Sequence, residues 1–171
     1  MLLLVRFLLC IGGSFFRRRI GVTDASVVRF TVLPQDCDLN VHLNSGRFIS
    51  FSDVARVELL GRMRLIAPIL RRGWRPVLGG IVVRYRRSIG PLQRFTITSR
   101  LVAWDAKWFY VEHVIESGGK LCAIAHARTA FRSREATLTT RDLLGLAKME
   151  DLESPPLPEL VARWIAAEDA R

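Results

Sequence analysis

The sequence predicts an α+β domain in which an antiparallel sheet curls around one buried helix, and three observations lead to this prediction. The first is a short alternation of apolar and polar residues at 26–33 (SVVRFTVL). The second is a long apolar segment with helical spacing that begins near Ser45. The third is a series of four strand-like segments after that helix, separated by turns so short that neighbouring strands must be antiparallel.

The first strand and the helix are predicted from two different periodicities. Apolar residues of the strand stand at every second position, at Val28, Phe30 and Val32. Apolar residues of the helix recur at steps of three and four, at Phe48, Phe51, Ala55, Leu59, Met63 and Ile66. Further apolar residues widen this surface, so we expect the helix to be buried on most sides. Asn44 or Ser45 is the expected cap, and Pro68 marks the expected end.

Four segments after the helix have the character of strands, namely 77–88, 93–104, 107–116 and 120–132. Turn signals separate them, namely IGP (89–91), WDAK (104–107) and SGGK (117–120). The sequence of the C-terminal tail predicts two short helices, at about 139–148 and 157–167, which are joined by the proline-rich SPPLP. The predicted organisation is therefore an N-terminal segment (1–25), one α+β domain (26–135) and a helical tail (136–171).

Composition and charge limit the class of protein. The 171 residues suffice for one domain with a sizeable core, and half of them are hydrophobic. Lys and Arg number 26 against 16 acidic residues, so anionic partners such as phosphate-bearing cofactors or lipid head groups are expected. Nucleic acid is not an expected partner, because the basic residues are scattered and no nucleic-acid-binding module accompanies them. The three cysteines include no CxxC pair, which predicts a reducing compartment and no metal site.

The first nineteen residues, MLLLVRFLLCIGGSFFRRR, form an apolar segment that ends in three arginines. A secretory signal would carry its charge before the apolar run, whereas here the charge follows it and Arg6 interrupts it. The run is also shorter than the roughly 20 apolar residues of a membrane-spanning helix. Two main interpretations stay open, a packed terminal helix and a peripheral membrane anchor whose arginines contact anionic lipid, with a short membrane span as a third.

The polar segment DCDLNVHLN (36–44) lies between the first strand and the helix. Asp38 and His42 are expected near the helix N-terminus, whose free N–H groups polarise a carbonyl group or hold an anion. A carboxylate at such a place suits acyl transfer, either as a general base on water or as a nucleophile. An aspartate before a helix is commonly a cap or turn residue. The combined spacing of Asp38, His42 and Asn44 nevertheless favours a catalytic site, while Asp36 is interpreted as a loop residue.

The run from Asp36 to Phe48 resembles the D-x-D-x-x-x-H-x-N-x-x-x-[YF] signature of the hotdog-fold 4-hydroxybenzoyl-CoA thioesterase-like superfamily. Together with the apolar, Arg-rich start and the later Trp-Arg-Pro, it is similar to the branch of thioesterase superfamily member six-like proteins. The resemblance covers about residues 26–132. It implies a hotdog fold and hydrolysis of an acyl-CoA thioester to free acid and CoA, without a metal or redox cofactor. It also implies a homodimer or dimer of dimers with the active site at the dimer interface, and a cytoplasmic protein of lipid metabolism, free or peripheral at a membrane.

The resemblance assigns roles to individual residues of the loop. Asp38 corresponds to the catalytic carboxylate, as nucleophile or general base. His42 and Asn44 correspond to positions that orient the thioester carbonyl or the attacking water. The sequence departs from the signature at two places, since Val41 stands where many members have glycine and Phe48 where tyrosine is usual.

Substrate binding is expected from Gly46 and from an arginine cluster. Gly46, early in the helix, offers a backbone N–H as a donor to the oxyanion. Arg84, Arg86 and Arg87 are interpreted either as a clamp for the phosphates of CoA or as a solvated strand face that discourages aggregation. The alternative function is a non-catalytic acyl-binding or membrane-associated adaptor of the same fold, which the departure at Val41 and the N-terminal segment favour.

Overall fold

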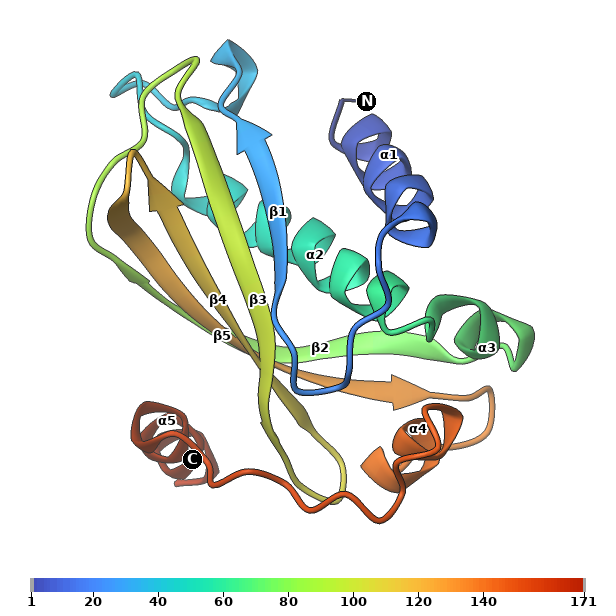
Figure 1. The fold of residues 1–171 in the computed structure, drawn as a ribbon. Coiled ribbons are helices and arrows are strands. Elements are labelled where there is room, and N and C mark those ends of the chain that lie inside the picture. The colour runs from blue at the N-terminus through green and yellow to red at the C-terminus, as the bar shows by residue number, and fades with distance from the viewer. Residues whose placement is uncertain (1, 171) are drawn as a thin grey trace.

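The computed structural model describes residues 2–170, and its centre is a five-stranded antiparallel sheet that curves around one helix (Figure 1). The strands are β1 (Ser26–Thr31), β2 (Arg75–Tyr85), β3 (Arg94–Trp104), β4 (Phe109–Ser117) and β5 (Lys120–Arg132). They lie in the order β1-β3-β4-β5-β2, so β1 and β2 form the two edges of the sheet. This architecture confirms the predicted α+β class.

Five α-helices accompany the sheet within the part of the chain that the structure describes, namely α1 (Leu2–Phe16), α2 (Ser45–Arg62), α3 (Ile66–Arg71), α4 (Thr140–Leu146) and α5 (Glu159–Asp169). A short 3-10 helix, η1 (Pro34–Asp36), follows β1. The predicted central helix corresponds to α2 but ends earlier than expected. Arg64 adopts a left-handed conformation with φ of 63°, and the Leu65 N–H donates back to the Leu60 carbonyl oxygen at 3.0 Å. This arrangement terminates a helix. Pro68 therefore lies in the first turn of the separate helix α3, where its missing N–H removes no hydrogen bond.

The central helix α2 is buried on most sides, as the sequence predicts, because the sheet covers one side and α1 covers another (Figure 1). Toward the sheet, Phe51 packs between Phe30 of β1 and Phe95 of β3, with ring centroids 4.8 and 5.2 Å away. Toward α1, Gly61 allows a close crossing, because a Cβ atom there would lie 2.1 Å from the hydroxyl oxygen of Ser14. Helix α2 therefore carries a large aromatic side chain where it packs against the sheet and a glycine where it crosses α1.

The tail helix α5 covers part of the outer face of the sheet. Val161 is fully buried there, and Trp164 packs with Trp108 around the side chain of Arg128. The Arg128 guanidinium lies 5.0 Å from the Trp108 ring centroid and 5.6 Å from that of Trp164, at distances typical of cation–π contacts. The two predicted tail helices are thus both present, and both pack against the domain.

Helix α1 corresponds to the apolar N-terminal segment of the sequence. Among residues 2–170, no helix combines the length and the hydropathy that crossing a membrane requires. Helix α1 instead packs along α2, which agrees with the interpretation as a packed terminal helix.

Candidate active site

The polar loop, the N-terminus of α2 and the end of β2 surround an open depression of about 370 Å³. Its lining residues are Asp38, Asn40, His42, Leu43, Ser45, Phe48, Tyr85, Arg86, Arg87 and Ser88. The structure therefore brings Asp38 and His42 together at the helix N-terminus, where the sequence places them. Arg86 and Arg87 reach the same depression from β2, which is far away in the sequence.

A tight turn shapes the loop around Asp38. The Asp38 N–H donates to the His42 carbonyl oxygen at 2.9 Å, and the Asp38 carbonyl oxygen accepts the Val41 N–H at 3.0 Å. The carboxylate is held as well, since Oδ1 accepts the Asn40 N–H at 2.9 Å. These hydrogen bonds fix the orientation of the carboxylate relative to His42 across a four-residue turn. Asn40, interpreted from sequence only as part of the polar loop, also lines the depression.

Val41 occupies a conformation that normally suits glycine. Its φ of 58° lies in the left-handed region, which costs a residue with a Cβ atom about 1–2 kcal/mol and is rare for β-branched residues. Val41 as a residue is 61% exposed, so its side chain is not forced into the core. The departure from the signature therefore places backbone strain in a turn that the hydrogen bond from the Val41 N–H to the Asp38 carbonyl oxygen closes.

Asn44 and Gly46 have a local structural role in this geometry. The Asn44 side chain is the N-cap of α2, and its Oδ1 accepts the Gly46 N–H at 2.9 Å. Asn44 does not line the depression, and the Gly46 N–H is already engaged by the cap rather than directed at a substrate. The preference of asparagine for the first position of a helix explains this arrangement. The Asn44 cap confirms the predicted start of the helix, while the orienting role of Asn44 and the oxyanion-donor role of Gly46 stay predictions.

Arg84 differs from its two neighbours in the arginine cluster. In β2, Arg84 pairs with Ile124 of β5, and the next residue, Tyr85, pairs with Ala123. Successive side chains of a strand point to opposite faces of the sheet, and Tyr85 points to the face that carries the depression. Arg84 consequently lies on the outer face of the sheet and outside the depression. Arg86 and Arg87 follow the end of β2, where the alternation of the strand no longer applies. The structure thus places two of the three expected arginines at the depression.

Tyr85 is a residue of the depression that the sequence analysis did not identify. Its hydroxyl donates to the Ser45 carbonyl oxygen at 3.0 Å, and its ring meets Phe48 edge-on at 5.4 Å. Burial raises the pKa of Tyr85, which further favours the protonated hydroxyl that donates this hydrogen bond. The alternation in β2 places Tyr85 on the face that carries Val83, but the sequence alone does not show that this face meets α2.

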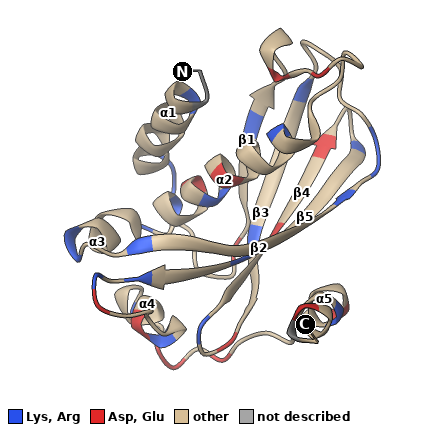
Figure 2. Ribbon diagram, turned by 180° about the vertical axis from the view of Figure 1, so that it is seen from behind, with Lys and Arg blue, Asp and Glu red and all other residues tan. Residues whose placement is uncertain are grey.

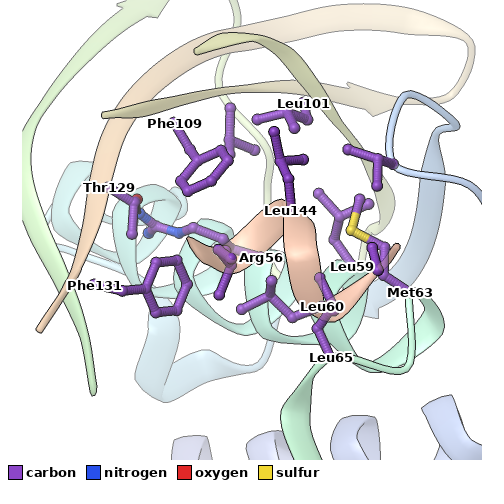
Figure 3. Close-up of a pocket in the computed structure, with 14 residues that line it drawn as sticks. Arg56, Leu59, Leu60, Met63, Leu65, Leu101, Phe109, Thr129, Phe131 and Leu144 are labelled. Atoms are coloured by element: carbon purple, nitrogen blue, oxygen red, sulfur yellow. Dashed lines mark hydrogen bonds between the residues drawn. The ribbon is translucent and has the colours of Figure 1, made fainter. Parts of the chain in front are cut away.

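A second cavity lies at the opposite end of α2 and belongs to the core (Figure 3). It has a volume of about 50 Å³ and is lined mainly by apolar side chains, including Leu59 and Met63 of α2 and Leu144 of α4. Arg56 reaches it but is held by Asp53 and by the Thr129 hydroxyl, which accepts a hydrogen bond at 3.1 Å. The packed cluster around Phe51 separates this cavity from the depression along the helix.

The curved sheet around α2, with a polar loop at the N-terminus of that helix, is the hotdog fold. Residues 32–165 match the family model of the thioesterase-like superfamily, and the chain belongs to this superfamily. Among curated proteins, it is 31% identical over 141 residues to Protein THEM6 of Xenopus laevis, which covers 81% of this chain and 66% of that protein.

Two further comparisons concern a second curated relative and the fold. The chain is 31% identical over 108 residues to Thioesterase poxG of Penicillium oxalicum, a match that covers 55% of this chain and 36% of that protein. Among solved structures, it is similar to YbaW, a probable thioesterase from Escherichia coli. That match has a TM-score of 0.66 and 21% identity, and covers 72% of this chain and 96% of the other. The chain spans about two thirds of the length of the Xenopus relative and about a third of poxG.

Proposed function

We propose that the protein is an acyl-CoA thioesterase, which hydrolyses an acyl-CoA thioester to a free acid and CoA. The observation that carries this proposal is that Asp38 and His42 line one depression with Arg86 and Arg87, beside the N-terminus of α2. Membership of the thioesterase-like superfamily and the similarity to Thioesterase poxG support the same activity.

The proposed chemistry uses the residues of the depression. The Asp38 carboxylate either attacks the thioester carbonyl carbon or removes a proton from the attacking water. His42 orients the carbonyl group or the water, and the positive end of α2 favours the negative charge that develops on the carbonyl oxygen. If Asp38 attacks, CoA leaves as the thiolate and water then hydrolyses the resulting acyl–Asp38 anhydride, which frees the acid. If Asp38 acts on water, the proton it removes passes to the departing sulfur and CoA leaves as the thiol. Arg86 and Arg87 bind its phosphates, since a guanidinium forms charge-assisted hydrogen bonds with phosphate oxygens. The proposed reaction needs no metal or redox cofactor.

Asp38→Asn tests this activity directly. We expect free-thiol release from short-, medium- and long-chain acyl-CoA substrates by the wild type, and a loss of about 100-fold or more in kcat for the variant, because the amide is neither base nor nucleophile. A matched control is Asp151→Asn, a carboxylate with 92% of its side chain exposed on the tail, which should keep the wild-type rate. Wild-type rates in Asp38→Asn would contradict the proposed mechanism.

A homodimer, or a dimer of such dimers, is part of the proposal. Strand β2 is an edge of the sheet, and apolar side chains along it are exposed, with Val77 at 39% and Leu78 at 42%. An unpaired edge strand offers a row of N–H and C=O groups to a second chain. A second copy placed at β2 would also lie beside the depression, because β2 ends there.

Peripheral contact with a membrane surface is supported by the outer face of α1. Several large apolar side chains of this helix are exposed, namely Leu4, Val5, Leu8, Leu9, Phe15 and Phe16. Arg18 and Arg19 follow directly and are exposed, whereas Arg17 is held by Glu58 at 3.0 Å. An apolar helix face beside free arginines is complementary to anionic lipid. This contact favours the second candidate function, a membrane-associated adaptor without turnover.

The other described arginines and lysines come from many elements of the fold, and Figure 2 shows them distributed over several helices and strands. This distribution supports acyl-CoA and lipid, rather than nucleic acid, as the proposed anionic partners. A cytoplasmic location and a role in lipid metabolism remain part of the same proposal.

A further inference from the structure

Arg6 in α1 extends its side chain to the polar loop. Its Nη1 donates to Asp36 Oδ2 at 2.8 Å, and its Nη2 donates to the Thr31 carbonyl oxygen at 3.0 Å. The guanidinium also lies 4.9 Å from the ring centroid of Phe51 in α2, and only 16% of the side chain is exposed. One residue of the N-terminal helix therefore contacts the end of β1, the loop and the central helix.

Asp36 joins the two ends of the loop. Its buried carboxylate accepts the Leu33 N–H at 3.0 Å, where the loop begins, and lies 3.9 Å from the Arg47 Nε of α2. Its backbone carbonyl oxygen accepts the Asn44 N–H at 2.9 Å, where the loop ends. A buried carboxylate requires a cation or several donors, so removing Arg6 takes away the closest charged partner of this junction.

Asp38 and His42 lie between these two ends, and their positions depend on the junction. Backbone hydrogen bonds hold the chain on both sides of this turn. Asp36 and Cys37 make them before the turn, and Leu43 and Asn44 make them after it. A shift of Asp36 is therefore transmitted to the turn that carries the Asp38 carboxylate. Arg6 itself does not line the depression.

A second ion pair at the other end of α1 separates positioning from simple attachment. Arg17 lies 3.0 Å from Glu58 of α2, and Glu58 also accepts a hydrogen bond from the Ser26 hydroxyl. This pair attaches α1 to the domain but has no contact with the loop. If α1 only covered α2, loss of the Arg6–Asp36 ion pair and loss of the Arg17–Glu58 ion pair would change the activity of the site equally.

We propose that Arg6 is a positioning residue of the active site, which holds Asp36 and thereby the loop in the geometry that directs Asp38 and His42 into the depression. The N-terminal helix is then a structural part of the catalytic machinery of this protein. This inference rests on the proposed thioesterase function for its kinetic consequence, and on the hydrogen bonds of Asp36 for its structural consequence.

The kinetic test compares Arg6→Gln, Arg6→Lys and Arg17→Gln in the full-length chain, with the acyl-CoA that the wild type hydrolyses best. We expect kcat to fall at least ten-fold in Arg6→Gln with KM within two-fold, because Arg6 does not touch the substrate. Arg6→Lys keeps the charge and should recover part of kcat, while Arg17→Gln should stay within two-fold of the wild type. Equal losses in Arg6→Gln and Arg17→Gln, or no loss in Arg6→Gln, would overturn the proposal.

Amide hydrogen exchange provides a readout that does not depend on turnover. The N–H groups of Asp38 and Asn44 should exchange faster in Arg6→Gln than in the wild type, and at the wild-type rate in Arg17→Gln. If the wild type hydrolyses no acyl-CoA, the proposed function fails and the exchange rates alone decide on Arg6. If Arg6→Gln does not fold, Asp36→Asn takes its place, since it keeps the shape of the side chain and removes its charge. Unchanged exchange at both amides would reject the positioning role.

Discussion

At the scale of the residue, the loop shows a conflict between side chain and backbone. Val41 adopts a left-handed conformation that favours glycine, while the hydrogen bonds of the turn between Asp38 and His42 hold it there. Strain of this kind persists only where surrounding contacts determine the backbone, and such places are frequently functional. The strain at Val41 thus belongs to the same turn that orients the proposed catalytic carboxylate.

Replacing this valine with glycine should stabilise the protein. Val41→Gly removes about 1–2 kcal/mol of left-handed strain and adds a smaller entropic cost in the unfolded chain, so we expect a gain of about 1 kcal/mol in the free energy of unfolding. Urea denaturation measures this gain. Val27→Gly is the matched control, because Val27 is a partly exposed valine in β1, where glycine should destabilise by about 0.5–1 kcal/mol. Similar destabilisation in both variants would refute the strain at position 41.

At the scale of the element, much of the fold could be predicted because the spacing of the apolar residues differs between strands and helices. Alternation predicted a strand with one buried face, and steps of three and four predicted a buried helix. The alternation at Val28, Phe30 and Val32 marked β1, and the steps along α2 marked a helix with neighbours on two sides. The end of α2 could not be predicted, because the left-handed conformation of Arg64 has no signature in the residue type. Helix α3 was missed for the same reason.

The element α1 carries its own prediction, that its outer face binds anionic lipid. The full-length protein should co-sediment with vesicles of phosphatidylcholine and phosphatidylserine, and less with phosphatidylcholine alone, since free arginines attract anionic head groups. Leu8→Ser with Leu9→Ser should reduce binding several-fold, because these side chains are 59% and 72% exposed. Leu160→Ser, at an exposed leucine of α5, is the control and should bind as the wild type does. Equal sedimentation of all variants would exclude α1 as the contact.

At the scale of the whole molecule, the candidate site is assembled from segments that are distant in the sequence. The spacing of Asp38 and His42 predicted the part of the site that lies in the loop, because the two residues are close in the sequence and share one turn. The contribution of Tyr85 and the separation of Arg84 from its neighbours depend on which face of β2 meets α2, and this requires the tertiary structure. Asn44 was the expected helix cap as well as an expected site residue, and the structure uses its side chain for the cap.

The assembled molecule should be a dimer that pairs at β2. Light scattering should give about twice the 19.4 kDa of one chain, or about four times for a dimer of dimers. Leu78→Lys places a charge on the exposed edge and should shift the protein toward the monomer, because edge lysines oppose strand pairing. Leu160→Lys introduces the same charge at a leucine with the same exposed fraction, 42%, on α5 and should leave the mass unchanged. A monomeric wild type at micromolar concentration would exclude the dimer.

The contact between Arg6 and Asp36 has a consequence for the evolution of this protein. The two residues are thirty positions apart, and loss of either removes the closest charged partner of the other beside a proposed catalytic loop. Related chains should therefore inherit arginine and aspartate at these positions together or replace them together. A lineage that lost the arginine is expected to carry a neutral residue in place of the aspartate, and to have found another way to hold its loop.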